Sequence, residues 1–259
     1  MDYLKFGIDI IIEIVIFLAL MIVGIYISKL NLNNNRFLNP NEYLPDEEIH
    51  TLKQVLYLIL IALCFINVLY SLTYMSNDLF YFALFDLILS LYIAVTIDKS
   101  SIWHKILILL LVPYGSLSYL LFAWNSGGIL ELIHIPIFLY LMKVYYSKFM
   151  DYTQSNGLGF AILLLFLIIF ISFFITQITE GVNPLDSIVM VSNAFTSNGY
   201  AVLGSSIPGK LNSLFLVWGG YVISGVGTAT LTATILIRQF NKRIKQLEEL
   251  IDEESDLDG

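Results

Sequence analysis

Long apolar stretches separated by short polar connections run along the chain. Seven of these stretches each hold about 20 mostly apolar residues, which is the length that crosses the hydrocarbon core of a bilayer. Turn-like segments rich in Asn, Asp, Ser and Gly separate them. The stretches cover residues 7–28, 52–73, 79–97, 103–123, 129–147, 158–178 and 213–238. The pattern predicts an all-α integral membrane protein with seven transmembrane helices.

Composition agrees with this membrane prediction. The chain is 58% hydrophobic and 13% charged, whereas soluble domains carry roughly 25% charged residues. Much of the acid behind the formal net charge of −8 lies in the C-terminal tail, so we interpret that charge as local and expect no nucleic-acid partner. Cys64 is the only cysteine, which excludes an intrachain disulfide and a cysteine-based metal cluster.

The distribution of Lys and Arg predicts how the chain is oriented. Cytoplasmic loops of membrane proteins carry an excess of these residues. With the C-terminus inside, eleven of them fall in inside segments, and only Lys5 and Lys210 fall outside. The inside set is Lys29, Arg36, Lys53, Lys99, Lys105, Lys143, Lys148, Arg238, Lys242, Arg243 and Lys245. We therefore expect a multi-pass protein of the cell membrane, with its N-terminus outside and its C-terminus in the cytoplasm.

The connection between the last two predicted spans is unusual, because its middle is too apolar for a solvated loop. Asn183 followed by Pro184 is a favourable helix start, and Asp186 suits the positive end of a helix. A helix over 184–195 would have 12 residues and a length of roughly 18 Å, enough to descend halfway into a bilayer. Its carbonyl end would favour a cation. The pattern predicts a re-entrant pore helix in a cation pathway, and the alternative is an extracellular loop with an incidental amphipathic helix.

The segment after this helix is polar and reads Thr196-Ser197-Asn198-Gly199-Tyr200, and it is the candidate selectivity filter. It resembles the filter of the tetrameric P-loop cation channels, where potassium channels carry Thr-Val-Gly-Tyr-Gly after the pore helix. Thr196, Gly199 and Tyr200 match by residue type. The chain departs from the pattern by one extra residue before Gly199 and by Ala201 in place of the second glycine. The stretch "SNAFTSNGYAVLG" is also similar to the filter loops of Trk/Ktr potassium-transporter subunits.

The resemblance covers residues 158–238 and implies a pore module of outer helix, pore helix, filter and inner helix. One chain supplies one module, so a homotetramer in the lipid bilayer is needed to encircle the ion. The permeant ion would be K⁺ or Na⁺, held at filter carbonyls only, and no cofactor is expected. The candidate pore-mouth carboxylates are Glu180 and Asp186. The candidate inner-helix hinge positions are Gly219, Gly220, Gly225 and Gly227.

The other parts of the chain carry weaker signals. Residues 1–30 are expected to form an additional N-terminal transmembrane helix, and residues 31–51 a cytoplasmic loop. Residues 52–148 are similar in helix number to the S1–S4 domain of voltage-gated channels. Their last helix has no arginine, so steep voltage gating is not expected. Residues 239–259 are expected to form a short cytoplasmic helix and an acidic tail.

Ionisable residues inside a predicted span are candidates for a functional role, because charge at membrane depth is costly. Asp86 and His134 form a candidate intramembrane polar pair, whereas Asp9 and Glu131 lie near outer helix ends, where they can reach water. The pattern contains no nucleophile with its base and no metal-ligand cluster. We therefore expect that the chain is not an enzyme.

Three functions remain open at this point. The first is a monovalent-cation channel, with potassium favoured, that is not strongly voltage-gated. The second is a Trk/Ktr-like potassium-uptake subunit, for which a separate regulatory subunit is a candidate partner. The third is a non-conducting seven-helix membrane sensor or scaffold. Oligomeric state distinguishes the last from the first, because one module cannot enclose an ion.

Overall fold

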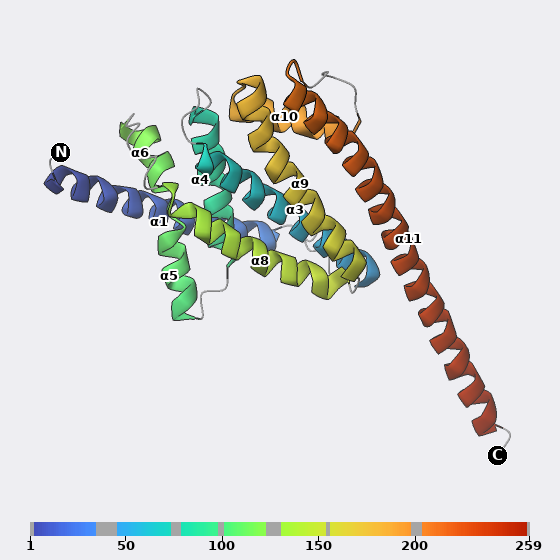
Figure 1. The fold of residues 1–259 in the computed structure, drawn as a ribbon. Helices are drawn as coiled ribbons and strands as arrows, with labels where there is room; N and C mark the ends of the chain where they lie inside the picture. The colour runs from blue at the N-terminus through green and yellow to red at the C-terminus, as the bar shows by residue number, and fades with distance from the viewer. Residues whose placement is uncertain are drawn as a thin grey trace. The chain divides into compact units, whose positions relative to one another are not determined.

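The computed structural model describes residues 3–34, 46–73, 79–97, 101–122, 131–153, 156–197 and 204–257. These residues form helices and turns, and they contain no β-strand (Figure 1). The helices are α1 (Tyr3–Asn34), α3 (Asp46–Leu72), α4 (Leu79–Thr96), α5 (Ile102–Leu110), α6 (Tyr114–Phe122), α8 (His134–Thr153), α9 (Asn156–Glu180), α10 (Pro184–Phe195) and α11 (Ile207–Leu257). The predicted all-helical class is confirmed.

Four of the described helices are long and apolar enough to cross a membrane. The apolar parts are Phe6–Lys29 of α1, Leu52–Leu72 of α3, Gly157–Glu180 of α9 and Ile207–Glu248 of α11. The helices α5 and α6 add a fifth span if they count as one broken helix. The chain is therefore a membrane protein, and the full number of seven spans stays a prediction.

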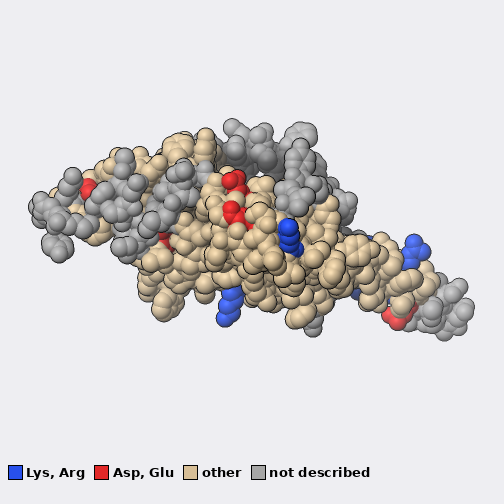
Figure 2. Space-filling model, turned by 45° about the horizontal axis from the view of Figure 1, so that its top comes forward, with Lys and Arg blue, Asp and Glu red and all other residues tan. Residues whose placement is uncertain are grey.

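The surface is suited to contact with lipid. Large apolar side chains are exposed along the helices, among them Ile178 at 82%, Tyr221 at 81% and Trp218 at 68%. Figure 2 shows that lysine, arginine and acidic residues are sparse on the face that it presents. Such a surface is costly in water, whereas in a bilayer the hydrocarbon chains cover it.

Helix extends into two segments that the sequence predicts to be a loop or a tail. Residues 31–51 are not a loop throughout, because α1 continues to Asn34 and α3 already begins at Asp46. At the other end of the chain, helix continues through Leu257, so the acidic tail is helical as far as the structure describes it.

The predicted span 103–123 is two helices rather than one. The axes of α5 and α6 differ by 42° across Leu111, Val112 and Pro113. Pro113 has no backbone N–H to donate, and its ring conflicts with the preceding turn of a helix. The hydroxyl of Tyr114 instead donates to the carbonyl of Leu109, at 3.1 Å. A proline inside an apolar stretch thus breaks the helix without ending the stretch.

The chain divides into two compact units. The first comprises Met1–Tyr152 with Asn183–Leu185, and the second comprises Thr153–Val182 with Asp186–Gly259. In the first unit, α4 packs against α1, α3 and α6. The N-terminal helix α1 is thus an integral part of that unit, since it also contacts α6. In the second unit, α9 and α11 run side by side (Figure 1).

Candidate ion pathway and buried polar cluster

The half-helix α10 begins and ends at the residues that the sequence predicts, Pro184 and Phe195. Asp186 lies in its first turn, where a carboxylate favours the positive end of the helix. Its 12 residues correspond to roughly 18 Å. This length is well short of the roughly 30 Å hydrocarbon core, so α10 cannot span a bilayer.

Apolar packing in the second unit buries one face of α10. Val191 is 0% exposed and Ala194 is 8% exposed, and both belong to a core cluster shared with the long helices. The other buried members are Ala161 and Ile168 of α9 and Leu216 and Ile223 of α11. The buried hydroxyl of Ser187 donates to the carbonyl oxygen of Phe173 on α9, at 2.8 Å. The half-helix is therefore held as part of a core, unlike a solvated loop.

The carbonyl end of α10 lies against α11 at Gly220. A Cβ atom at this position would overlap the carbonyl oxygen of Phe195. Only a glycine permits this backbone contact. The helix α11 runs without interruption through Gly219, Gly220, Gly225 and Gly227. The hinge assigned to these glycines stays a prediction, and Gly220 has a packing role that the sequence did not reveal.

Two of the five candidate filter residues lie in the described part of the chain. Thr196 and Ser197 form a turn directly after α10, with N–H groups that donate to the carbonyls of Ser192 and Ala194 at 3.0 and 3.2 Å. Ser197 has a φ of 57°, the left-handed conformation that commonly terminates helices. Asn198, Gly199 and Tyr200 lie outside the described residues.

The candidate pore-mouth residue Glu180 accepts three hydrogen bonds at the end of α9. The donors are the N–H of Ser205 at 3.0 Å, the hydroxyl of Ser205 at 3.1 Å and the hydroxyl of Ser206 at 3.3 Å. The Ser206 hydroxyl in turn accepts from the N–H of Gly209, at 3.1 Å, and so caps α11. Glu180 thus fastens the start of α11 to the end of α9.

Replacement of Glu180 by alanine is expected to lower the thermal unfolding midpoint of the detergent-solubilised protein. The change removes the acceptor of all three hydrogen bonds and loosens the N-terminal cap of α11. Glu180→Gln keeps one acceptor oxygen, so its loss should be smaller. Glu248→Ala, on the exposed part of α11, serves as the control. Equal midpoints for the Glu180→Ala variant and the wild type would contradict the role of this carboxylate.

A second polar link joins α9 and α11. The amide of Asn212, which is 6% exposed, donates to the carbonyl oxygen of Ser172 at 3.4 Å and to the hydroxyl of Thr176 at 3.1 Å. Sequence reasoning did not single out this residue. The available signal was an amide directly before the apolar last span, where an unsatisfied polar group would be costly once it is buried.

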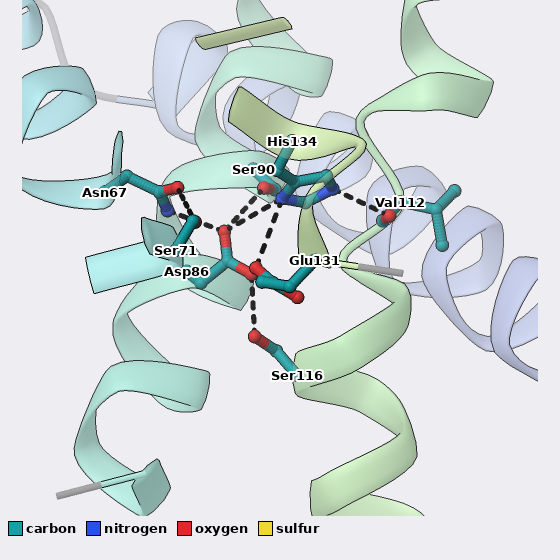
Figure 3. Close-up of polar contacts among 8 residues, drawn as sticks. All are labelled: Asn67, Ser71, Asp86, Ser90, Val112, Ser116, Glu131 and His134. Carbon is teal, nitrogen blue, oxygen red and sulfur yellow. Dashed lines mark hydrogen bonds and ion pairs between the residues drawn. The ribbon is translucent and has the colours of Figure 1, made fainter. Parts of the chain in front are cut away.

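In the first unit, the structure brings Asp86 and His134 together in a buried cluster (Figure 3). Nδ1 of His134 lies 3.4 Å from Oδ1 of Asp86, and both side chains are fully buried. Asp86 also accepts hydrogen bonds from the amide of Asn67 and from the hydroxyl of Ser116, each at 2.7 Å. The hydroxyl of Ser90 is a more distant donor, at 3.4 Å. Four elements therefore contribute side chains to the surroundings of one carboxylate.

Glu131 is the third ionisable member of this cluster, and the expectation that it reaches water is wrong. Its side chain is fully buried, and Oε1 lies 3.6 Å from Nδ1 of His134. The sequence also predicts no metal-ligand cluster, yet Asp86, Glu131 and His134 each place a ligand-type atom within 4.8 Å of the others. These residues lie in separate apolar segments, so their spacing carries no motif. The fold alone brings them together.

The break at Pro113 positions two groups of the cluster. The carbonyl of Val112 lies in the bend and accepts a hydrogen bond from Nε2 of His134, at 2.8 Å. Ser116 lies in the first turn of α6, three residues beyond the proline, and reaches Asp86. The same carbonyl accepts from the N–H of Tyr114, at 2.9 Å. The bend thus places a backbone acceptor where the histidine can reach it.

A further buried carboxylate joins α1 to α6. Glu13 is 0% exposed, and one of its oxygens accepts a short hydrogen bond from the hydroxyl of Ser118. The sequence places this carboxylate inside the first apolar stretch but does not indicate its partner. Its hydrogen bond links α1 to α6 and supplies the donor that a buried carboxylate needs.

The described helices define an all-helical membrane protein with a short half-helix between two long ones. No protein-family model, curated protein or solved structure matches the chain.

Proposed function

We propose that the chain is the subunit of a monovalent-cation channel that favours potassium. Residues 158–238 form its pore module, and Thr196 to Tyr200 form the filter. The observation that carries the proposal is α10, a 12-residue half-helix whose buried face packs in one core cluster with α9 and α11. In the proposed arrangement α10 enters the bilayer from outside, and the filter follows its carbonyl end.

The electrostatics of a half-helix support a cation as the ligand. The last carbonyls of a helix carry a partial negative charge of about half an elementary charge. At membrane depth this charge is weakly screened, so it attracts a cation that has lost part of its water shell. Filter carbonyls from several chains then replace the lost water. A glycine allows such carbonyls to point in one direction, because it adopts left-handed φ values without strain.

The proposal requires a closed oligomer, and we infer a homotetramer in the cell membrane. One re-entrant segment covers only part of the circumference of an ion, so four copies would each contribute a quarter. The N-terminus would lie outside and the C-terminus in the cytoplasm, following the distribution of Lys and Arg. Lys143 and Lys148 of α8 are too few for a steep voltage sensor, because each charge that crosses 100 mV supplies about 2.3 kcal/mol.

Cation flux into liposomes tests the proposal. The pure wild-type protein is expected to conduct K⁺, and Na⁺ less well. Gly199→Ala is expected to reduce K⁺ flux at least about tenfold, because a Cβ costs roughly 1–2 kcal/mol per subunit at a left-handed position. Gly7→Ala is the matched control, since a Cβ there has open space around it. Unchanged flux in Gly199→Ala would remove the filter assignment.

Two alternatives give different outcomes in the same preparation. A Trk/Ktr-like uptake subunit would show K⁺ flux that depends on a separate regulatory subunit. A sensor or scaffold would show no flux and no need for a tetramer. A strictly monomeric protein in mild detergent would therefore exclude the channel.

A further inference from the structure

Asp86, Glu131 and His134 meet at one buried point of the first unit with the spacing of metal ligands. Nδ1 of His134 lies 3.4 Å from Oδ1 of Asp86 and 3.6 Å from Oε1 of Glu131. Two ligands held about 2.1 Å from one tetrahedral Zn²⁺ are about 3.4 Å apart. An ion between the imidazole and the two carboxylates would therefore need only small shifts of these side chains.

The hydrogen bond of His134 to the backbone directs its other nitrogen toward the carboxylates. The carbonyl of Val112 can only accept, so Nε2 carries the proton of this 2.8 Å bond. In the neutral imidazole, Nδ1 then presents a lone pair toward Asp86 and Glu131 (Figure 3). Metal-bound histidines commonly have this arrangement, in which a backbone carbonyl fixes the tautomer and orientation of the ring.

Glu131 is the least satisfied group of the cluster. Both of its oxygens and Nδ1 of His134 are buried and make no hydrogen bond of ordinary geometry within the part of the chain that the structure describes. The oxygens of Asp86, by contrast, are oriented by Asn67 and Ser116. A buried carboxylate without donors is costly unless it is neutralised or coordinates a metal. The orphaned atoms point to a missing ligand.

Charge balance indicates what that ligand is. Two ionised carboxylates and a neutral imidazole carry two negative charges, which one divalent cation cancels. Among the described residues, the basic side chain beside Asp86 and Glu131 is that of His134, and no lysine or arginine pairs with either carboxylate. Imidazole nitrogen together with carboxylate oxygen suits a transition metal better than Mg²⁺ or Ca²⁺, which prefer oxygen ligands alone.

We propose that Asp86, Glu131 and His134 bind one divalent transition-metal cation of the Zn²⁺ type. The ion has a structural role, because it joins α4 to the start of α8 in a site that is fully buried. The three ligands lie outside residues 158–238, so this site does not depend on the proposed pore.

Metal content is the direct test. Full-length protein is purified in detergent from zinc-supplemented cells, washed with a weak chelator and measured by inductively coupled plasma mass spectrometry. We expect about one transition-metal ion per chain and a loss of about tenfold or more in Glu131→Gln. Glu13→Gln, which changes another fully buried carboxylate, is expected to retain the wild-type content. Wild-type content below about a tenth of an ion, or equal content in Glu131→Gln, overturns the proposal.

Thermal stability gives a second test. If the site holds a metal, zinc raises the unfolding midpoint of the wild-type protein and not that of Glu131→Gln, because the variant lacks a ligand. If the site is empty, zinc leaves both midpoints unchanged. An equal response of the two proteins to zinc therefore overturns the proposal. Should the variant fail to accumulate, Co²⁺-loaded wild-type protein decides, because a bound ion produces visible d–d absorption and an unbound site does not.

Discussion

Replacement of Gly220 by alanine is expected to destabilise the second unit and to abolish cation flux. The new Cβ would overlap the carbonyl oxygen of Phe195, at the end of α10. Because the overlapping atom belongs to the backbone, no side-chain rotation relieves the conflict, and α10 or α11 has to move. Overpacking of this kind costs typically about 1–3 kcal/mol. The thermal unfolding midpoint in detergent and K⁺ flux in liposomes measure the two effects.

The neighbouring glycines supply graded controls for this change. A Cβ at Gly219 meets only the end of the Ile168 side chain, at 3.4 Å, and a Cβ at Gly225 meets no atom within 4 Å. Gly225→Ala is therefore expected to leave stability unchanged or slightly higher, because alanine favours helix over glycine by about 1 kcal/mol. If all three alanine variants had the same unfolding midpoint and the same K⁺ flux, the contact between Phe195 and Gly220 would not contribute to stability or to flux.

Replacement of Asp86 by alanine is expected to be the most destabilising change in the first unit. The buried carboxylate accepts hydrogen bonds from Asn67 and Ser116 and lies beside His134. Its removal leaves these donors without their acceptor and leaves Glu131 and His134 without their third partner. Removing one member of a buried ion pair costs about 3–5 kcal/mol. The variant should therefore unfold at a much lower temperature, or accumulate poorly in the membrane.

Asp151→Ala is the control for this prediction, because Asp151 is an exposed carboxylate in the last turn of α8. It is expected to shift the unfolding midpoint very little. Asp86→Asn should lie between the two, since an amide keeps one acceptor oxygen but loses the charge. A wild-type midpoint in Asp86→Ala would mean that the cluster contributes nothing to stability.

Both ends of α10 could be predicted correctly because local signals in the sequence mark them. Asn183 and Pro184 start the helix and polar residues follow Phe195, so both ends are encoded within a few positions. The apolar pattern likewise locates the long helices. The boundaries at Asn34 and Asp46 are missed because helical residues extend beyond the apolar stretches into polar sequence.

The contents of the polar cluster could be predicted only in part. Asp86 and His134 are recognisable because a charge or an imidazole inside a span requires a partner. From the sequence, Glu131 is expected to reach water because the residue lies close to the end of a predicted helix. Burial depends instead on which helices pack around that end, and periodicity does not contain this information. The close contact at Gly220 could not be predicted from the sequence either, because nothing in the sequence distinguishes this glycine from the other three candidate hinge glycines of the same helix.

The uninterrupted course of α11 has a mechanical consequence. Its 51 residues extend over about 75 Å, while a bilayer core occupies about 30 Å. If the helix turns as a rigid rod about Gly220, a tilt of about 5° displaces Leu257 by roughly 5 Å, because 1.5 Å per residue places that end about 55 Å away. The far end would then amplify small movements near the proposed filter. A bend at Gly225 or Gly227 would uncouple the two ends of α11, so the stiffness of the helix at these two positions determines whether movement at the proposed pore reaches the C-terminal end.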